Sequence, residues 1–242
     1  MELQPIAYRY EGTVLTGYLA DGSSGRPSPG ILVAHEGGGL ARHTKERARR
    51  LGELGYVAFA LDMYGEEDVT LERAMELGKA LRTDTQRIRG LLEAALQVLT
   101  RQSNVDRSRL AAIGYCMGGA AAIELARTGA PLQCIIGFHA GVLEAPPEDD
   151  KAITGKVLLC HGAEDPIVPP ARIHAFTGAL TAAQVDWQLH LLGGVGHSFT
   201  NPDIDPLGIA GFAYDPTADA RSWQAMLDLF DEVLTRTLDG QA

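Results

Sequence analysis

The sequence predicts an α/β fold, in which a mostly parallel central sheet carries helices on both faces and an N-terminal β-hairpin precedes it. From residue 30 onward, short and almost wholly apolar runs alternate with segments of helical period. A run that is apolar at nearly every position suits a strand covered on both faces, as in a parallel sheet. Crossover helices between parallel strands then cover both faces of that sheet.

The first part of the chain departs from this alternation. Residues 6–10 and 13–20 alternate or run apolar around a Glu-Gly pair, which predicts a hairpin. Residues 21–30 are rich in Gly, Ser and Pro and predict a surface loop. The first core strand follows at residues 30–35. It ends in glycines 37–39, which either approach a ligand through the backbone or form a flexible loop.

The remaining elements follow in alternation. A second core strand is expected at residues 56–61, and further strands at residues 110–115, 132–138, 156–162 and 185–192. Helices are expected at residues 43–54, 85–100, 120–126, 171–181 and 218–238. The first of these helices carries Arg and Lys, which we place on its outer face. Loops, with helical patches in the first, are expected at residues 66–84, 146–150 and 201–216.

Bulk composition limits the class of protein. A chain of 242 residues with no visible linker is expected to form one domain, residues 1–242. A hydrophobic content of 45% and a charged content of 21% are ordinary for a soluble globular protein. The net charge of −10, without any Lys/Arg cluster, argues against a nucleic-acid partner, because phosphate contacts need a basic face.

The cysteines and the N-terminus indicate a cytoplasmic protein. Cys116, Cys134 and Cys160 are too few and too scattered for a disulfide framework, and an odd number favours a reducing compartment. We find no signal-like start and no apolar run of the roughly 18 residues that cross a bilayer. No metal-ligand spacing is present either. We therefore expect no membrane partner, no metal and no cofactor, and a monomer or small homo-oligomer.

The most informative stretch is Gly-Tyr-Cys-Met-Gly-Gly at residues 114–119, which follows an apolar run and precedes a helical pattern. A strand, a sharp turn and a helix in this order expose the central side chain on strained backbone. This predicts a nucleophile elbow with Cys116 in place of the usual serine. The alternative is a glycine-rich turn around a buried cysteine. Cys134 and Cys160 lie inside apolar strands and are expected to pack in the core.

Two more side chains with suitable chemistry follow apolar strands. Asp165 comes after the strand at 156–162, and His197 after the strand at 185–192. Parallel strands end at one edge, so both should converge on Cys116. The imidazole can then take the thiol proton while the carboxylate holds its tautomer. The order nucleophile, acid, histidine is that of α/β-hydrolases. Taken singly, the aspartate could instead cap a turn, and the histidine could be a surface loop residue.

These features resemble those of the dienelactone hydrolases (carboxymethylenebutenolidases) of the α/β-hydrolase superfamily. The resemblance covers roughly residues 5–238. Its motifs are residues 114–119, His-Gly-Ala-Glu-Asp-Pro at 161–166, Gly-His-Ser-Phe at 196–199, and Glu36 at the end of the first core strand. It implies an α/β-hydrolase fold and cofactor-independent hydrolysis of a small-molecule ester or lactone substrate.

The resemblance also implies a role for each matching residue. Cys116 would be the nucleophile, His197 the base and then the acid, and Asp165 the orienting carboxylate. Glu36 would help to form the thiolate once substrate is bound, because a permanent thiolate is prone to oxidation. Its alternative is a loop carboxylate that faces water.

The implied oxyanion hole consists of the backbone N–H groups of Met117 and Gly37. In the family, arginines hold a substrate carboxylate, and one of them comes shortly after His-Ser-Phe. Here residues 200–202 are Thr-Asn-Pro, so a neutral or more apolar ester is expected, with Arg73 and Arg82 as candidates for the second arginine. The candidate pocket residues are Tyr64, Tyr115, Phe199, Phe212 and Tyr214.

Two competing functions stay open. The His-Gly-x-x-Asp pattern also occurs in peptidases of the prolyl-oligopeptidase type, although these use serine and usually carry a propeller domain. A catalytically silent binding module, or a thiol redox sensor that uses Cys116, belongs to a different class. Such a sensor would have no need of both Asp165 and His197.

Overall fold

The computed structural model describes residues 1–66 and 69–235. Over these residues the strands form a single sheet of eight, in the order β1-β2-β4-β3-β5-β6-β7-β8. The strands are β1 (Gln4–Tyr10), β2 (Thr13–Asp21), β3 (Ser28–Ala34), β4 (Val57–Leu61), β5 (Val105–Tyr115), β6 (Cys134–Phe138), β7 (Lys156–Gly162) and β8 (Trp187–Leu192). β2 pairs antiparallel with β1 on one side and with β4 on the other, and the strands from β3 onward pair parallel with one another. The predicted mostly parallel sheet with its N-terminal hairpin is confirmed.

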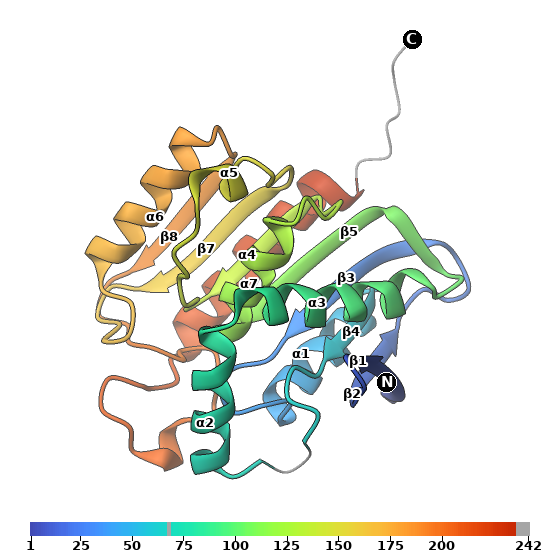
Figure 1. The fold of residues 1–242 in the computed structure, drawn as a ribbon, viewed down its shortest axis with the longest axis horizontal. Coiled ribbons are helices and arrows are strands. Elements are labelled where there is room, and N and C mark those ends of the chain that lie inside the picture. Colours follow the sequence, from blue (N-terminus) through green and yellow to red (C-terminus); the bar gives the residue numbers. More distant parts are fainter. Residues whose placement is uncertain (67–68, 236–242) are drawn as a thin grey trace.

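Helices cover both faces of the sheet, as Figure 1 shows. They are α1 (Arg42–Glu53), α2 (Leu71–Arg82), α3 (Thr85–Thr100), α4 (Met117–Ala126), α5 (Pro147–Asp150), α6 (Pro170–Ala182) and α7 (Pro216–Phe230). α3, α4 and α6 bury their apolar residues in one core, while α1 and α7 bury theirs in a second core behind the sheet. β3, β4, β6 and β7 are therefore buried on both faces, as their apolar sequences predicted. The edge strand β8 has no fully buried residue.

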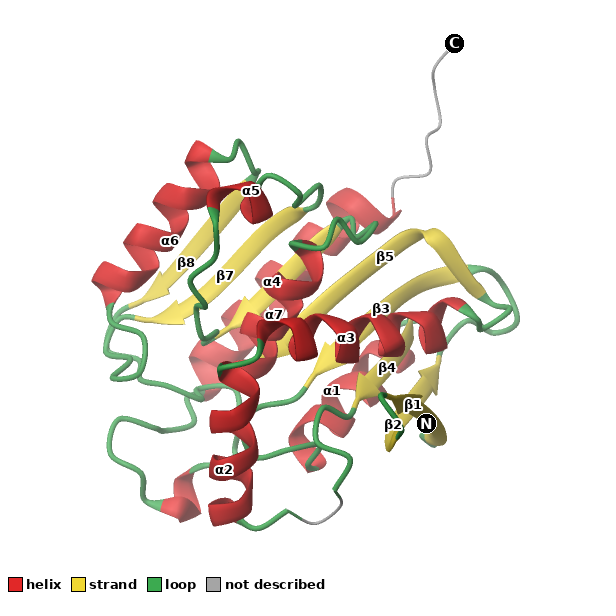
Figure 2. Cartoon of the chain, viewed as in Figure 1, coloured by secondary structure: helices red, strands yellow, loops and turns green. Residues whose placement is uncertain are grey.

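The carboxyl ends of the parallel strands lie along one edge of the sheet, and their arrowheads point the same way in Figure 2. Ala34 of β3 pairs with Gly114 of β5, and Tyr115 pairs with Phe138 of β6. On the far side, β7 and β8 also end in register. Side chains that follow β3, β5, β7 and β8 are thus placed along the same edge.

Two segments are more regular than the sequence predicted. Residues 71–82 form a continuous helix, whose N-cap is the Thr70 side chain accepting from the Arg73 N–H. The helix buries only Ala74, Gly78 and Leu81, so its apolar stripe is too narrow to stand out. The predicted acidic loop at 146–150 contains the single helical turn α5.

The C-terminal helix divides into two parts. α7 ends at Phe230, and a π-helical turn, Asp231–Thr235, continues it. The last three positions of the predicted helix, 236–238, lie outside the described residues. The loop expected at 201–216 holds a 3₁₀ turn, Asp205–Leu207, and is otherwise irregular as predicted.

One prediction about α1 is wrong. Arg47 does not lie on the outer face with the other basic residues but is 3% exposed. Its guanidinium donates to the Asp219 carboxylate of α7 at 2.8 Å and to the Thr200 carbonyl at 2.5 Å. A buried guanidinium needs such partners, and they come from the far end of the chain.

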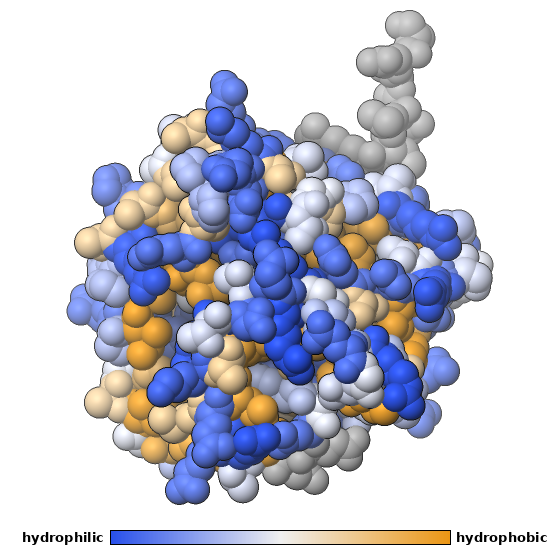
Figure 3. Space-filling model, viewed as in Figure 1, coloured by the Kyte–Doolittle hydropathy of each residue, from blue (hydrophilic) through white to orange (hydrophobic). Residues whose placement is uncertain are grey.

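The molecular face in Figure 3 mixes hydrophilic and hydrophobic residues over the helices α2 and α3. Exposed large hydrophobic side chains, such as Met75 on α2, occur among charged ones. Scattered exposure of this kind is normal for a folded domain. Within residues 1–66 and 69–235, none of the helices has the length and apolar composition that crossing a membrane would require.

Candidate active site

Cys116 occupies a sharp turn between β5 and α4. Its backbone has φ 52° and ψ −114°, in a region that non-glycine residues enter only under strain of about 1–3 kcal/mol. Neighbouring backbone compensates, since Cys116 N–H donates to Phe138 O at 3.0 Å and Gly141 N–H donates to Cys116 O at 2.9 Å. The structure thus contains the turn that the sequence predicted as an elbow.

Two glycines allow strand and helix to meet at this turn. A Cβ on Gly114 would lie 2.0 Å from the Gly118 carbonyl oxygen, and a Cβ on Gly118 would lie 2.4 Å from the Ala34 carbonyl oxygen. Real Cβ atoms do not approach backbone so closely. The turn therefore depends on glycine at both positions.

His197 and Asp165 meet beside this turn, although 32 positions separate them in the sequence. The Nδ1 atom of His197 lies 2.6 Å from Oδ2 of Asp165. The other carboxylate oxygen accepts from the N–H groups of Ile167 at 2.7 Å and Val168 at 2.9 Å. Burial alone would raise the pKa of Asp165, but the hydrogen bond with His197 and these amides lower it. The carboxylate is thus ionised and fixed in orientation.

The second ring nitrogen of His197 is on the side of Cys116. Burial alone would lower the pKa of His197, but the contacts with Asp165 and the Cys116 thiol raise it to about 10. No protein group in the described part of the chain makes an aligned hydrogen bond with Nε2. Nε2 therefore has no hydrogen-bond partner among the described residues that would keep it from exchanging a proton with the Cys116 thiol.

The loop predicted at 201–216 folds back over His197. The His197 N–H donates to Gly211 O at 2.9 Å, and the Ala213 N–H donates to His197 O at 3.2 Å. The Phe212 ring packs against the imidazole edge to face, with 4.7 Å between centroids. This segment therefore covers the imidazole, as expected for a wall of the site.

The predicted oxyanion donors are free to bind a ligand. Among the hydrogen bonds of the described residues, none uses the N–H of Gly37 or of Met117 as donor. A Cβ built on Gly37 or Gly38 would meet nothing within 4 Å, so this loop borders open space. Met117 is the first residue of α4, where helix N–H groups have no intrahelical acceptor.

Glu36 follows β3 and is largely buried. Its Oε2 accepts from the Asn201 side chain at 2.9 Å, and its Oε1 lies 3.6 Å from His139 Nε2 and 3.9 Å from His43 Nδ1. Burial raises the pKa of Glu36 to about 7, and the Asn201 hydrogen bond only partly opposes this. The hydrogen bonds found over residues 1–66 and 69–235 connect this carboxylate to Asn201 and not to Cys116.

Polar residues that the sequence did not single out surround Glu36. His139 Nε2 lies 2.9 Å from the Thr200 hydroxyl, and Arg47 donates to His43 Nε2 at 3.1 Å. The His139 and His197 rings pack edge to face with 5.1 Å between centroids. His139 directly follows β6, just as the predicted site residues follow their strands, and this position was its one sequence signal.

Comparison with known proteins places the chain in a family. The family model described as "Dienelactone hydrolase family" matches residues 15–234. The chain belongs to the dienelactone hydrolase family. The predicted resemblance and the prediction of a dienelactone hydrolase-like hydrolase are therefore confirmed.

Individual relatives agree with this assignment. A solved dienelactone hydrolase-like promiscuous phosphotriesterase from metagenomic libraries is 43% identical, with a TM-score of 0.92 over 96% of this chain and 98% of that one. The carboxymethylenebutenolidase of Pseudomonas putida is 27% identical over 78% of this chain and 82% of its own length. A probable 2-oxo-3-(5-oxofuran-2-ylidene)propanoate lactonase of Bradyrhizobium sp. is 27% identical, covering 82% of both chains. The structural match confirms the α/β-hydrolase fold.

The predicted pocket residues differ in their surroundings. The Tyr64 hydroxyl donates to Gly37 O at 2.9 Å beside the predicted oxyanion donors, and Phe212 covers His197. Tyr115 and Phe199 are fully buried, so their rings pack in the core and do not face solvent. Tyr214 is half-buried over Asp219, at 3.5 Å between the hydroxyl and the carboxylate.

The two candidate arginines of α2 also separate. Arg73 is exposed and pairs with Glu66 and Glu76. Arg82 lies near the site, because its Nη1 and the Tyr64 hydroxyl would both contact a Cβ at Gly78, at 3.4 and 3.1 Å. Of the two candidate arginines, Arg82 is therefore the one near Tyr64.

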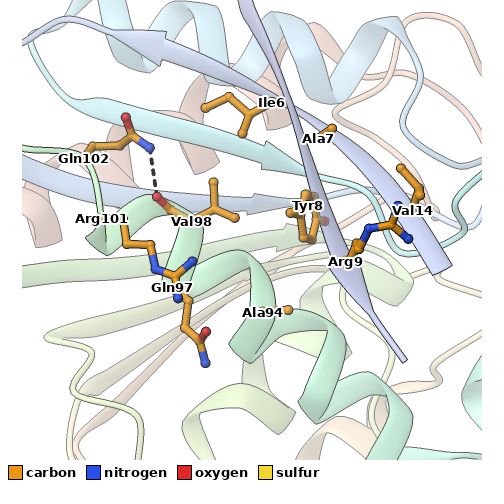
Figure 4. A pocket seen from close by; sticks show the side chains of 10 residues that line it. All are labelled: Ile6, Ala7, Tyr8, Arg9, Val14, Ala94, Gln97, Val98, Arg101 and Gln102. Atoms are coloured by element: carbon orange, nitrogen blue, oxygen red, sulfur yellow. Dashed lines mark hydrogen bonds between the residues drawn. The ribbon is translucent and has the colours of Figure 1, made fainter. Parts of the chain in front are cut away.

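A cavity elsewhere on the molecule does not belong to this site. It has a volume of about 590 Å³ and lies between β1 and α3 (Figure 4). Its lining includes Tyr8, Arg9, Val98 and Arg101, and none of the predicted site residues. It offers no nucleophile with an adjacent base, unlike the candidate site at the carboxyl ends of the strands.

Proposed function

We propose that this dienelactone hydrolase family member hydrolyses small esters or lactones through a triad of Cys116, His197 and Asp165. The observation that carries the proposal is the 2.6 Å hydrogen bond between His197 and Asp165, with the other ring nitrogen beside the Cys116 thiol. A buried imidazole held in this way is suited to move a proton to and from a sulfur atom.

In the first half of the reaction, His197 takes the proton of Cys116 and the thiolate attacks the ester carbonyl carbon. The N–H groups of Met117 and Gly37 hold the negative oxygen of the tetrahedral intermediate. The intermediate collapses, the bond to the alcohol oxygen breaks, and His197 returns its proton to that oxygen. An acyl thioester on Cys116 remains.

In the second half, water replaces the alcohol. His197 takes a proton from the water, and the resulting hydroxide attacks the thioester carbonyl. The second tetrahedral intermediate uses the same two N–H groups. It releases the carboxylic acid, and the sulfur of Cys116 receives its proton back from His197.

We assign Glu36 an auxiliary role in forming the thiolate after substrate binds. Its carboxylate pairs with Asn201 in this structure, so reaching the thiol requires a side-chain rotation away from that amide. A pKa near 7 means that a small change in environment switches its protonation. This fits a group that takes a proton only when the site is occupied.

The surroundings favour an uncharged substrate. Thr200 and Asn201 stand where the family carries an arginine, and the net charge of −10 gives no long-range attraction for anions. Arg82 supplies one cation at the edge of the site. We further propose a cytoplasmic protein of one domain, as a monomer or small homo-oligomer.

The triad is tested by replacing the sulfur. Cys116→Ala should abolish turnover of p-nitrophenyl acetate and of a simple lactone, because no nucleophile remains. Retention of most of the activity would refute the assignment. Turnover of a panel of peptides tests the peptidase alternative. Oxidation of Cys116 by peroxide, in a protein that turns over no ester, would instead indicate a redox sensor.

A second candidate activity is phosphotriester hydrolysis. It is favoured by one observation, the 43% identity with a solved promiscuous phosphotriesterase. The same thiolate would attack a neutral phosphorus centre and displace a phenol or alcohol, which takes its proton from His197, while the two N–H groups hold the phosphoryl oxygen. Water that gives a proton to His197 then breaks the S–P bond, releases the phosphodiester and leaves the Cys116 sulfur free again. Turnover of paraoxon that is lost in Cys116→Ala would support it, and turnover that survives the substitution would exclude this site.

A further inference from the structure

We propose that His35, assisted by the Tyr64 hydroxyl, is a positioning residue that aims the Gly37 N–H into the oxyanion site. The inference rests on the proposed function, because it concerns the carbonyl oxygen of the same substrate. His35 directly follows β3 and is fully buried. It is not a member of the triad, and its ring has a different set of partners.

Two donors hold the peptide bond between Glu36 and Gly37 through its carbonyl oxygen. The Glu36 carbonyl oxygen accepts from His35 Nδ1 at 2.6 Å and from the Gly39 N–H at 3.1 Å. In a trans peptide the C=O and N–H groups point in opposite directions, and the described residues contain no cis peptide. Holding the carbonyl on one side therefore fixes the direction of the Gly37 N–H on the other.

The contacts of the His35 imidazole select one tautomer. The Met63 N–H donates to His35 Nε2 at 3.1 Å, so Nε2 must be the unprotonated nitrogen. Burial lowers the pKa of His35, which keeps the ring neutral. A neutral ring with Nε2 as acceptor carries its proton on Nδ1. His35 is thus set to donate to the Glu36 carbonyl.

The carbonyl group of the next peptide is held as well. The Tyr64 hydroxyl donates to the Gly37 carbonyl at 2.9 Å, and the Tyr64 ring packs edge to face on His35 with 4.8 Å between centroids. Asp62 in turn accepts from the Tyr64 N–H at 2.8 Å. The carbonyls on both sides of the Gly37 α-carbon are therefore held, which matters because a glycine backbone has little stiffness of its own.

The other predicted donor needs no such help. Met117 N–H belongs to the peptide whose carbonyl, Cys116 O, accepts from the N–H groups of Gly119 at 3.1 Å and Gly141 at 2.9 Å. Main-chain groups alone fix that peptide. Of the two donors, only the Gly37 N–H is oriented with the help of side chains. A substitution of those side chains can therefore disturb its orientation and leave the turn at Cys116 unchanged.

Two substitutions separate the contacts of His35. His35→Asn places an amide nitrogen near the Nδ1 position and can keep the donor to the Glu36 carbonyl, while it loses the contact with Met63. His35→Gln can keep an acceptor for the Met63 N–H but loses the donor to Glu36. We expect kcat for p-nitrophenyl acetate to fall about 10- to 100-fold in the Gln variant, and less than about 5-fold in the Asn variant.

A second readout distinguishes positioning from a structural role. Alkylation of Cys116 by iodoacetamide needs the thiolate but no oxyanion donor, so its rate should stay within about twofold of the wild type in both variants. His174→Gln, at an exposed position of α6, serves as the control for histidine replacement. Tyr64→Phe should lower kcat several-fold with KM unchanged, and it carries the test if His35→Gln does not fold.

Several results would overturn the inference. Wild-type kcat in His35→Gln, or in Tyr64→Phe where the Gln variant does not fold, would show that the Gly37 peptide needs no such support. Equal losses in ester turnover and alkylation would assign His35 to the thiolate or to the fold. The proposed function is tested separately, because full activity in Cys116→Ala would refute it whatever the His35 variants show.

Discussion

Glu36→Gln should make the protein more stable above neutral pH. The pKa of Glu36 is raised from 4.5 to about 7 by burial. This difference corresponds to roughly 3 kcal/mol of preference for the neutral carboxyl in the folded state. The amide of the variant is neutral at every pH and can still accept from Asn201, so it avoids the cost of holding a buried charge.

The stability of the folded state depends on pH because the pKa of Glu36 is higher in the folded chain than in the unfolded one. Below pH 4.5 the carboxyl is protonated in both folded and unfolded chains, and its charge costs nothing. As the pH rises toward 7 the unfolded chain ionises first, so the folded state loses stability, and above 7 the loss levels off. The stability advantage of the variant should therefore grow by roughly 2.5 kcal/mol between pH 5 and pH 8.

Urea denaturation followed by tryptophan fluorescence measures this difference. The free energy of unfolding is determined for wild type and Glu36→Gln at pH 5 and at pH 8. Glu93→Gln, at an exposed position of α3, is the matched control and should show no such growth. An advantage for Glu36→Gln that stays constant or shrinks with pH would refute the assignment of a raised pKa to this carboxyl.

Three further substitutions test other parts of the structure. Asp165→Asn removes the charge that holds His197, and kcat for p-nitrophenyl acetate should fall about 1,000-fold or more, with little change in melting temperature. Gly118→Ala should destabilise the fold by about 4 kcal/mol or more in urea titrations, because its Cβ would lie 2.4 Å from backbone. Gly178→Ala, in open space on α6, should be neutral or stabilising by comparison. Arg47→Met leaves the Asp219 carboxylate without its buried partner, and we expect a loss of about 3 kcal/mol in the same assay. A stability within 1 kcal/mol of wild type would show that this ion pair contributes little.

The edge of the sheet at which the candidate site lies could be predicted from the sequence, because the site residues come shortly after predicted strands. Cys116, Asp165 and His197 each follow an apolar strand, and parallel strands align their carboxyl ends. No long-range contact had to be known for this argument. The alternation of strands and helices could be predicted for the same reason, since it depends only on local periodicity.

Local periodicity could not predict contacts between residues that are far apart in the sequence. Arg47 follows the spacing of a surface residue of α1, and its buried partner Asp219 lies 172 positions away. The direction of the Glu36 side chain depends on Asn201, which is 165 positions away. Local patterns place a residue on an element, but they do not state which residue the fold brings opposite to it.

Main-chain hydrogen bonds hold the backbone at position 116. The N–H and C=O of Cys116 bond only to the main chain of Phe138, Gly119, Ala120 and Gly141 among the backbone contacts of the described residues. The sulfur contributes nothing to that frame. A single codon change could therefore swap the reactive atom for oxygen while the scaffold stays as it is, so that new chemistry becomes accessible to evolution or to an engineer without a new architecture.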